Sequence, residues 1–401
     1  MFDVIIIGAG ASGLYAAKEI KKKKVLILEK NDRVGFKLSI TGKTQCNYTH
    51  AGQIKDFYDK YGTNKKFVKE GLYSHKNTDV IDYFESRGVA SLVREDGKVF
   101  PRSLDSNDIV ETLLGDAKKN AIIKLSESVS NILRNDDEFI VQTSKDSYRA
   151  KNVIVATGGM SYPVTGSTGD GYKLLERLGH KIIKPRPALT PVYVKNFRLV
   201  DVAGISFESI EITRKSSDSS VSKFTGDVLI THKGLSGPAI IDNSRYFKVL
   251  DLLELNLVSK TIREVDTMLI KYISENGKKQ ASSLVEIFDI PRRVFELLLI
   301  ESDIKKDTKL SEISKLKRKN IAVNLSSYKC EISSLGDYRI AMITSGGVDI
   351  SQVNPKTMQS KKLDGLYILG ELLDIDANTG GYNLQWAFSS AYLAAKNINK
   401  M

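Results

Sequence analysis

The sequence has 401 residues and a formal net charge of +12 at pH 7, and 41% of its residues are hydrophobic. This composition excludes an intrinsically disordered chain, and no apolar run approaches the roughly 20 residues that span a bilayer. The first apolar run begins next to Asp3, which leaves no room for a secretory signal peptide, so we expect a cytoplasmic protein.

The first thirty residues carry the most specific local pattern. The β-branched run Val4–Ile7 predicts a buried strand, and Val25–Leu28 predicts a second strand that ends at Glu29. Between them, glycines follow in GxGxxG spacing at Gly8, Gly10 and Gly13. In a dinucleotide-binding turn these glycines permit the bend, the approach of a pyrophosphate and close helix packing. The carboxylate of Glu29 would accept hydrogen bonds from ribose hydroxyls and would repel a 2′-phosphate.

The next segments predict a mixture of helices and strands. Residues 31–50 show little periodicity and predict a loop that crosses a site, whereas residues 53–88 and 105–119 predict helices. Residues 121–150 predict the short strands of a β-meander. Asn152–Gly159 predicts another buried strand, and this strand ends in glycines.

A change of character follows in the middle of the chain. The three prolines of residues 185–191 predict a linker. The following segments then predict a domain organisation: a discontinuous α/β nucleotide-binding domain of residues 1–188 and 345–401, a β-rich insertion of residues 189–260 and 320–344, and a helical subdomain of residues 261–319.

Glycines at three strand ends favour FAD over NAD. Besides the GxGxxG turn, glycines follow the strands predicted around Val153 and Leu366, and ligands of open α/β sheets bind beyond such strand ends. Glu371 or Asp374 could bind ribityl hydroxyls, and Gly381 precedes a helix whose N–H groups could face the flavin. The alternative is that these glycines only turn the chain.

Several segments together resemble the BaiN/RdsA family (YhiN-type) of FAD-dependent oxidoreductases. They are GAGASG, LEK, KLSITGKTQCNYT, FPRS, YPVTGSTGDGY, LITHKGLSGPAI and the stretch from GGVDISQ to SSAYLA. The resemblance covers nearly the whole chain. It implies a Rossmann-like FAD-binding domain that carries an inserted β-barrel-like domain and a small helical subdomain. It also implies a bound FAD, and reduction of carbon–carbon double bonds in steroid-like substrates for some members.

One departure from the family pattern concerns the loop of residues 42–47. Where the family usually reads Gly-Gly-Gly-Arg-Cys-Asn, this chain has Gln45 in place of the arginine, although Lys43 keeps a positive charge nearby. If that arginine binds a phosphate or a substrate anion, the same function is in doubt here.

The combined interpretation is a flavoprotein that transfers a hydride through non-covalent FAD to an unidentified small molecule. The expected cofactor contacts are Gly8, Gly10, Ala11, Ser12, Gly13, Glu29, Lys30, Lys37, Leu38, Thr44, Cys46, Asn47, Ala156, Thr157, Gly158, Gly370, Glu371, Asp374, Gly381, Tyr382, Asn383 and Leu384. The chain shows no second GxGxxG motif in a strand–turn–helix context, so a nicotinamide donor NAD(P)H would bind in a different way or only transiently, and another small molecule or a protein is the alternative reductant. A nucleic-acid-modifying flavoprotein and a flavin sensor without turnover are the alternatives.

Candidate proton donors are Tyr162, Tyr382, His232 and Arg102, each with a structural alternative. Tyr382 could instead pack beneath the last helix, and His232 could be a solvated residue of a turn.

The remaining features favour simple interpretations. Cys46 and Cys330 are far apart, and the four histidines lack metal-ligand spacing, so we expect no structural metal. The lysines are scattered, with few aromatic residues between them, which is typical of a solvated surface. We therefore expect no nucleic-acid partner and no membrane partner.

Overall fold

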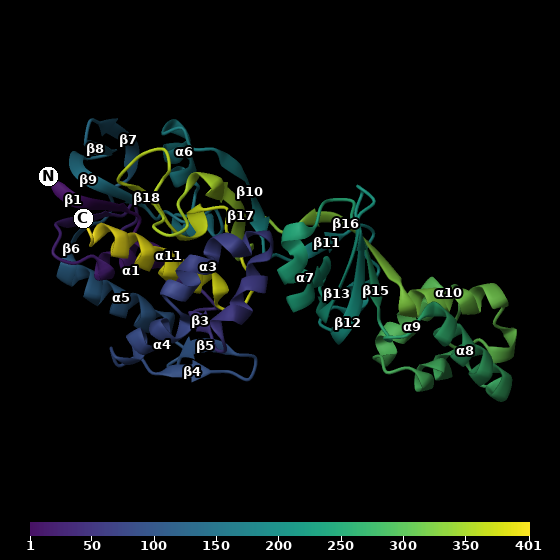
Figure 1. Cartoon of the computed structure of the whole chain (residues 1–401). Coiled ribbons are helices and arrows are strands. Elements are labelled where there is room, and N and C mark those ends of the chain that lie inside the picture. Colours follow the sequence, from purple (N-terminus) through teal and green to yellow (C-terminus); the bar gives the residue numbers. More distant parts are fainter. The chain divides into compact units, whose positions relative to one another are not determined.

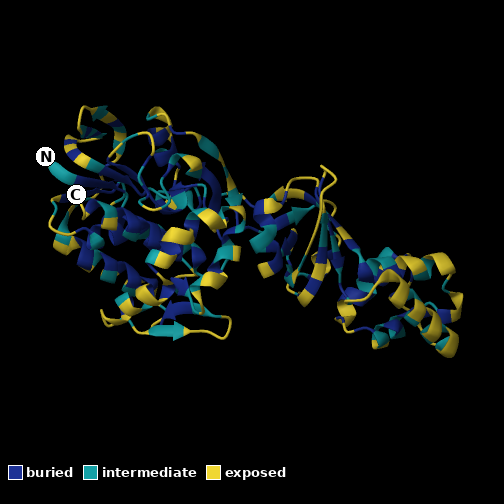
Figure 2. Cartoon of the chain, in the orientation of Figure 1, coloured by how far each residue is buried: buried dark blue, intermediate teal, exposed yellow.

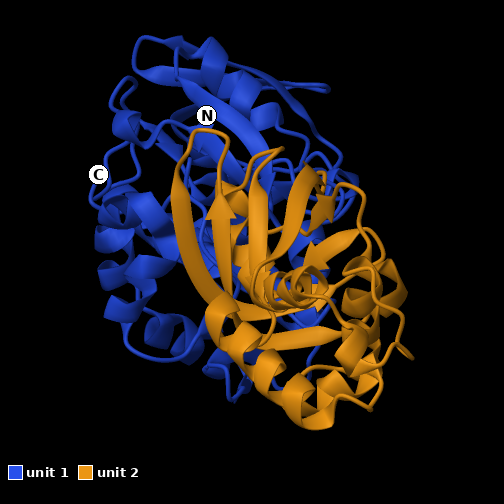
Figure 3. Cartoon of the chain, turned by 90° about the vertical axis from the view of Figure 1, so that its right-hand side faces the viewer, with its two compact units in different colours: residues 1–188, 338–401 blue, residues 189–337 orange.

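The computed structural model describes residues 1–401 and divides them into two compact units, residues 1–188 with 338–401 and residues 189–337 (Figure 3). Each unit has its own apolar core, and the buried strands and helices appear dark blue in Figure 2. The first unit combines both ends of the chain.

A seven-stranded sheet forms the centre of the first unit (Figure 1). Its strands β6, β2, β1 and β9 are parallel neighbours, β18 pairs parallel with the end of β9, and β8 and β7 continue antiparallel from the start of β9. The bounds are β1 Phe2–Ile7, β2 Val25–Leu28, β6 Ala121–Lys124, β7 Val129–Asn135, β8 Glu138–Thr143, β9 Ser147–Val155 and β18 Leu366–Ile368. The short apolar runs of the sequence are thus buried parallel strands, as predicted.

Helices pack against this sheet and against one another. Helix α1 (Ala11–Glu19) contacts both α5 (Ser106–Asn120) and α11 (Tyr382–Ile398), so the first and last helices of the unit are neighbours. The other helices of this unit are α2 Phe36–Ser39, α3 Lys65–Ser74, α4 Asn77–Glu85 and α6 Asp170–Arg177. A small antiparallel sheet of β3 (Thr49–His50), β5 (Lys98–Pro101) and β4 (Ser91–Val93) completes it.

The proline-rich segment differs from the expected linker. Pro185 and Pro187 lie within strand β10 (Ile182–Ala188), which pairs antiparallel with β17 (Ile343–Val348). The register shifts between Ile183 and Arg186. Proline lacks an N–H donor, and a two-stranded ribbon with a bulge tolerates it because few of its donors are needed for pairing.

The second unit contains a closed barrel of six antiparallel strands in the order β11-β14-β13-β12-β15-β16. The bounds are β11 Val192–Val194, β12 Ser206–Lys215, β13 Val221–Ile230, β14 Gly234–Ser236, β15 Leu252–Asn256 and β16 Tyr328–Leu335, and α7 (Pro238–Asn243) packs against β13. Three further helices, α8 Ile262–Asn276, α9 Arg292–Glu301 and α10 Lys315–Ser326, lie between β15 and β16 in the chain. The predicted fold class, an α/β domain with an inserted barrel and helices, is confirmed.

No helix of the chain combines the length and the apolar character that a membrane crossing requires.

Candidate cofactor-binding site

The three glycines of the GxGxxG turn occupy different environments. Gly8 has a φ of +101°, and a Cβ there would lie 2.7 Å from the Ala156 carbonyl oxygen. A Cβ on Gly13 would lie 1.9 Å from the Gly8 carbonyl oxygen, so only glycine lets α1 pack this closely. A Cβ on Gly10 would meet no protein atom within 4 Å. Gly10 therefore borders open space, which a pyrophosphate needs.

Glu29 is held at the end of β2 by backbone donors. Its Oε2 accepts a hydrogen bond from the Ala9 N–H at 2.8 Å, and its Oε1 accepts one from the Asn31 N–H at 2.9 Å. Each carboxylate oxygen has a second lone pair, so the carboxylate can still accept ribose hydroxyls. The neighbouring Lys30 pairs with Asp170, a residue of α6.

The carboxyl ends of β1, β9 and β18 meet because these strands are parallel. A Cβ on Gly370 would lie against the Ser12 hydroxyl, so the turn after β18 touches the start of α1. Near the end of β9, the buried Thr157 Oγ1 and Tyr172 hydroxyl lack hydrogen-bond partners. Unpartnered buried polar atoms cost about 1–3 kcal/mol each. A polar ligand at this edge would satisfy them, so the residues fit a dinucleotide cofactor.

The expected ribityl ligand Glu371 already has two partners on the protein. Its Oε2 lies 2.7 Å from Lys37 Nζ, and its Oε1 accepts a hydrogen bond from the Thr344 N–H at 2.8 Å. The Thr344 hydroxyl in turn accepts the N–H groups of Met160 and Ser161 at 2.7 and 3.2 Å. Sequence reasoning missed Thr344, because a threonine within a strand has no distinctive spacing.

The loop of residues 41–47 has an unusual backbone. Lys43, Thr44 and Cys46 have φ values of +55°, +69° and +56°, a region that favours glycine. Non-glycine residues in such conformations cluster at functional sites, where the surrounding structure maintains the strain. Burial raises the pKa of the Cys46 thiol, so this cysteine is a neutral buried group and not a thiolate nucleophile.

An arginine from another element reaches the position where the family has its arginine. Arg94, just after β4, donates a hydrogen bond from Nη2 to Gln45 Oε1 at 2.8 Å. Its guanidinium carbon also lies 4.0 Å from the centre of the Phe100 ring. The sequence did not indicate this pairing, because the two residues lie on separate elements.

The start of α11 is tied to the small sheet. Gly381 has a φ of +92°, and a Cβ there would lie 2.3 Å from the Thr49 carbonyl oxygen. The Tyr382 ring stacks on His50, with 5.0 Å between ring centres. Asn383 binds both the N–H and the carbonyl of Ala377 at 2.9 Å. These residues therefore have packing roles, and their contact with a cofactor remains a prediction.

Five other expected cofactor contacts are placed as follows. Leu38 is buried in α2, and Gly158 has a φ of +71° directly after Thr157. Asp374 is half-buried, and burial followed by the neighbouring Asp376 raises the pKa of its carboxyl. Leu384 is half-buried in α11, and Ala11 opens α1.

The four candidate proton donors belong to different segments of the chain. Tyr162 is half-buried with a φ of +56°, in the loop after the Gly158 turn, and its N–H bonds the Tyr338 carbonyl at 2.8 Å. Tyr382 belongs to the aromatic stack described above. Arg102 is exposed after β5, and His232 is exposed in a turn of the second unit.

Comparisons with known proteins agree over the full chain. The family model described as HI0933-like protein Rossmann domain matches residues 2–397. A "Ribosomal RNA dihydrouridine synthase" of Haemophilus influenzae is 33% identical, covering 99% of this chain and 98% of the relative, and the Escherichia coli protein of the same name is 28% identical over 99% and 98%. A "3-dehydro-bile acid delta(4,6)-reductase" of Clostridium scindens is 27% identical over 98% and 97%.

Two solved structures share the fold. A flavocytochrome c3 fumarate reductase in its open conformation has a TM-score of 0.50 at 15% identity, over 100% of this chain and 78% of that chain. A 3-ketosteroid delta1-dehydrogenase of Sterolibacterium denitrificans has a TM-score of 0.50 at 11% identity, over 100% and 99%. At these identities the likeness concerns architecture alone.

Proposed function

Because this chain belongs to the HI0933-like Rossmann-domain family, we propose that it binds FAD non-covalently and reduces a carbon–carbon double bond conjugated to a carbonyl group. The activities for which its relatives are named share this chemistry. A dihydrouridine synthase saturates the C5–C6 bond of uracil, which is conjugated to a ring carbonyl. A 3-dehydro delta(4,6)-reductase acts on double bonds conjugated to a 3-keto group.

Uracil in ribosomal RNA is the first candidate substrate. Two full-length relatives are named for ribosomal RNA, at 33% and 28% identity. The net charge of +12 favours association with a polyanion. The scattered lysines alone favoured a solvated surface and no nucleic-acid partner. The names of the two relatives favour an RNA partner instead. A steroid-like enone, which the Clostridium scindens relative suggests at 27% identity, is the second candidate.

The open space beside Gly10 would admit the pyrophosphate of FAD, and the carboxylate of Glu29 would accept its ribose hydroxyls. The unpartnered hydroxyls of Thr157 and Tyr172 would gain polar partners at the same edge. FAD that an electron donor has reduced would supply the hydride for the β-carbon of the conjugated system and would be reoxidised by this transfer. The protein must then deliver a proton to the α-carbon.

Tyr162 is the proton donor that we favour. It is half-buried in the loop that follows the carboxyl end of β9, and its left-handed backbone is held by the Tyr338 carbonyl. Strained non-glycine residues of this kind are frequent at active sites. The other candidates either pack in an aromatic stack, as Tyr382 does, or are exposed, as Arg102 and His232 are.

A single-turnover experiment tests the function without knowledge of the natural electron donor. Purified protein is heated to release its cofactor, which mass spectrometry should identify as FAD. The holoprotein is then photoreduced under anaerobic conditions and mixed with total ribosomal RNA, with a 3-keto-4,6-diene steroid, or with buffer. We expect RNA to reoxidise the flavin and to gain two hydrogens at one uridine.

The outcomes separate the candidates. Reoxidation by the steroid alone would assign the second substrate, and reoxidation by neither would refute the proposed reaction. Tyr162→Phe should retain FAD and lose at least about tenfold in the rate of reoxidation, as loss of a general acid predicts. Retention of the full rate would show that another group delivers the proton.

A further inference from the structure

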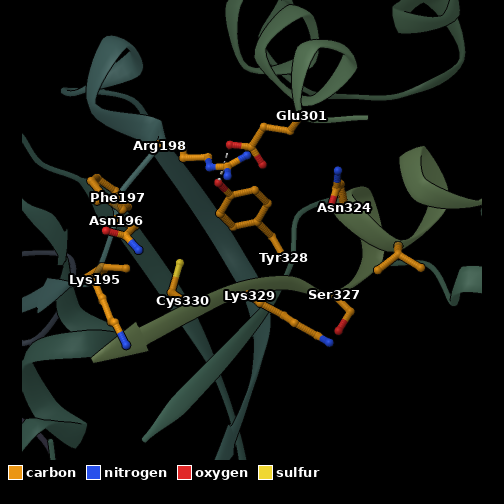
Figure 4. A pocket seen from close by; sticks show the side chains of 12 residues that line it. Lys195, Asn196, Phe197, Arg198, Glu301, Asn324, Ser327, Tyr328, Lys329 and Cys330 are labelled. Atoms are coloured by element: carbon orange, nitrogen blue, oxygen red, sulfur yellow. Dashed lines mark hydrogen bonds between the residues drawn. The ribbon is translucent and has the colours of Figure 1, made fainter. Parts of the chain in front are cut away.

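A cavity of about 270 Å³ lies inside the second unit, where the barrel meets the helices (Figure 4). One wall is the segment of residues 194–198, which leaves the barrel after β11. The other wall comes from the end of α9 and the end of α10, and the first residues of β16 run between the walls. None of these residues belongs to the cofactor site in the first unit.

The inner end of the cavity is polar and preorganised. The Tyr328 hydroxyl donates a hydrogen bond to Glu301 Oε1 at 2.9 Å, and Tyr328 is only 6% exposed. Burial raises the pKa of the Glu301 carboxyl. Asn324 donates from Nδ2 to the Ser302 hydroxyl at 3.1 Å, which leaves its side-chain oxygen available to a ligand.

The cations of the cavity exceed its carboxylates. Lys195 pairs with Glu331 at 3.0 Å, but neither Arg198 nor Lys329 forms an ion pair. Figure 4 shows the guanidinium of Arg198 beside the Tyr328 hydroxyl, and shows the lysine side chains away from Glu301. The charge of Arg198 also acts on the Glu301 carboxylate beside it, so the remaining positive charge of the site comes from Lys329, and it favours a ligand with an anionic part.

Flat groups line the same cavity. Phe197 is half-buried, Arg198 is exposed, and Asn196 holds a left-handed φ of +50° where the chain turns out of the barrel. Aromatic rings and guanidinium planes stack on unpaired bases, and side-chain amides bind base edges. Lysines bind the adjoining phosphates as point charges.

We propose that this cavity holds one unstacked nucleotide of the RNA substrate, with its base against Phe197 and Arg198 and its phosphate toward Lys329. The inference rests on the proposed function, because it takes RNA as the substrate. It assigns the second unit a role in RNA recognition that is separate from the chemistry of the first unit. The cavity of about 270 Å³ has the volume of roughly nine water molecules in the liquid, at about 30 Å³ each.

Outside the cavity, α10 adds exposed basic residues. Lys315 and Lys319 lie one turn apart on α10, are exposed and form no ion pair, in contrast to Lys317 and Arg318, which pair with Asp303 and Asp266. These free lysines would contact phosphates that flank the bound nucleotide. The contact would be electrostatic and would weaken with salt.

The test measures binding of a labelled single-stranded uridine-rich oligonucleotide to the full-length oxidised holoprotein by fluorescence anisotropy. Arg198→Ala/Lys329→Ala should weaken binding at least tenfold. It should also lower the slope of log affinity against log salt by about 0.7, because Lys329 is the phosphate contact and each single-strand phosphate contact contributes about 0.7. Lys271→Ala/Lys278→Ala is the matched control, since both lysines are exposed on or beside α8, form no ion pair and do not line the cavity.

Tyr328→Phe removes the hydroxyl that donates to Glu301 at the inner end of the cavity, without a change of charge, and it should weaken binding with no change of the salt slope. Arg198→Lys should do the same, because lysine keeps the charge and loses the planar face. Equal weakening by the α8 control would overturn the inference and indicate diffuse attraction. If UMP or NADPH binds with the same dependence on Arg198 and the oligonucleotide does not, the cavity is a free-nucleotide site and the RNA assignment is wrong.

The binding assay needs no reductant, so its result does not depend on whether the proposed reaction occurs. If cavity-dependent RNA binding occurs but no uridine is reduced, the inference stands and the proposed function fails. If uridine is reduced at the same rate by wild type and by Arg198→Ala/Lys329→Ala at limiting RNA, the function stands and the inference fails.

Discussion

Lys37 and Glu371 form an ion pair of 2.7 Å between the first and last segments of the chain, and the same carboxylate accepts the Thr344 N–H. Both side chains are largely shielded, at 24% and 21% exposure. One carboxylate thus joins three segments of the discontinuous unit at the edge where the parallel strands end.

We predict that Lys37→Met and Glu371→Gln each lower the stability of the unit and the FAD affinity, with a coupling energy of about 1–2 kcal/mol in a double-mutant cycle by urea unfolding. The control is the Lys65–Asp59 pair, which has a similar distance of 2.8 Å but exposures of 52% and 82%. Its coupling should be clearly smaller than that of the Lys37–Glu371 pair because solvent screens it. Equal coupling in both cycles would show that the Glu371 pair is no more than a surface contact.

The glycines of the turn should respond differently to substitution. Gly10→Val should leave the apoprotein as stable as wild type and abolish FAD binding, because its side chain would enter the open space. Gly13→Ala should destabilise the fold by about 1–3 kcal/mol, since its Cβ would overlap the Gly8 carbonyl oxygen. Thermal unfolding of apoprotein and flavin titration measure the two effects separately.

Gly115 of α5 provides the control for these substitutions. A Cβ there would meet nothing within 4 Å, so Gly115→Ala should stabilise the helix by about 0.5–1 kcal/mol and leave FAD binding unchanged. Loss of stability in Gly10→Val without FAD would contradict the assignment of open space at this position.

We predict that the buried His75 makes the folded protein less stable in acid. Its ring is 7% exposed, stacks on Tyr392 at 4.5 Å, and its Nε2 lies 2.5 Å from the Tyr15 hydroxyl. Burial, followed by the charge of Lys18, lowers the pKa of His75 from 6.5 to about 4. Between these values only the unfolded chain binds the proton, so stability falls as the pH falls from 6.5 toward 4.

The shift corresponds to about 3 kcal/mol at about 1.4 kcal/mol per unit. We expect wild type to lose about 2–2.5 kcal/mol of this between about pH 7 and about pH 4.5 in urea unfolding, relative to His75→Gln. The buried His180 contributes in the same direction, because burial lowers its pKa as well, so His180 must remain unchanged in both proteins. If the free energies of unfolding of wild type and His75→Gln change with pH in parallel, His75 takes up its proton in the folded state as readily as in the unfolded chain.

Arg94 should supply the positive charge that Gln45 lacks. We predict that Arg94→Ala slows reoxidation of the reduced holoprotein by RNA at least tenfold, and that adding Gln45→Arg restores the rate. Arg134→Ala is a matched control, because Arg134 also lies over a ring, Phe139, with 4.5 Å between its guanidinium carbon and the ring centre, but it belongs to β7. An unchanged rate in Arg94→Ala would show that Arg94 does not take over the role of the arginine that Gln45 replaces.

The family and its oxidoreductase class followed from the sequence, and the full-length family match confirms them. The sequence by itself also indicated the buried strands around Val4, Val25 and Val153, the GxGxxG turn and the α/β class. These features are local: a strand is a short apolar run, and the glycines and Glu29 act within about thirty consecutive residues, where periodicity and spacing are readable.

Only the tertiary structure decided which distant side chains meet. It paired Lys37 with Glu371 and Arg94 with Gln45, placed Pro185 in a strand, and brought Arg198 to the cavity beside Tyr328. Such contacts depend on strand order and on which loops close together. The periodicity of a segment specifies which face is buried, but it does not specify the partner that covers this face.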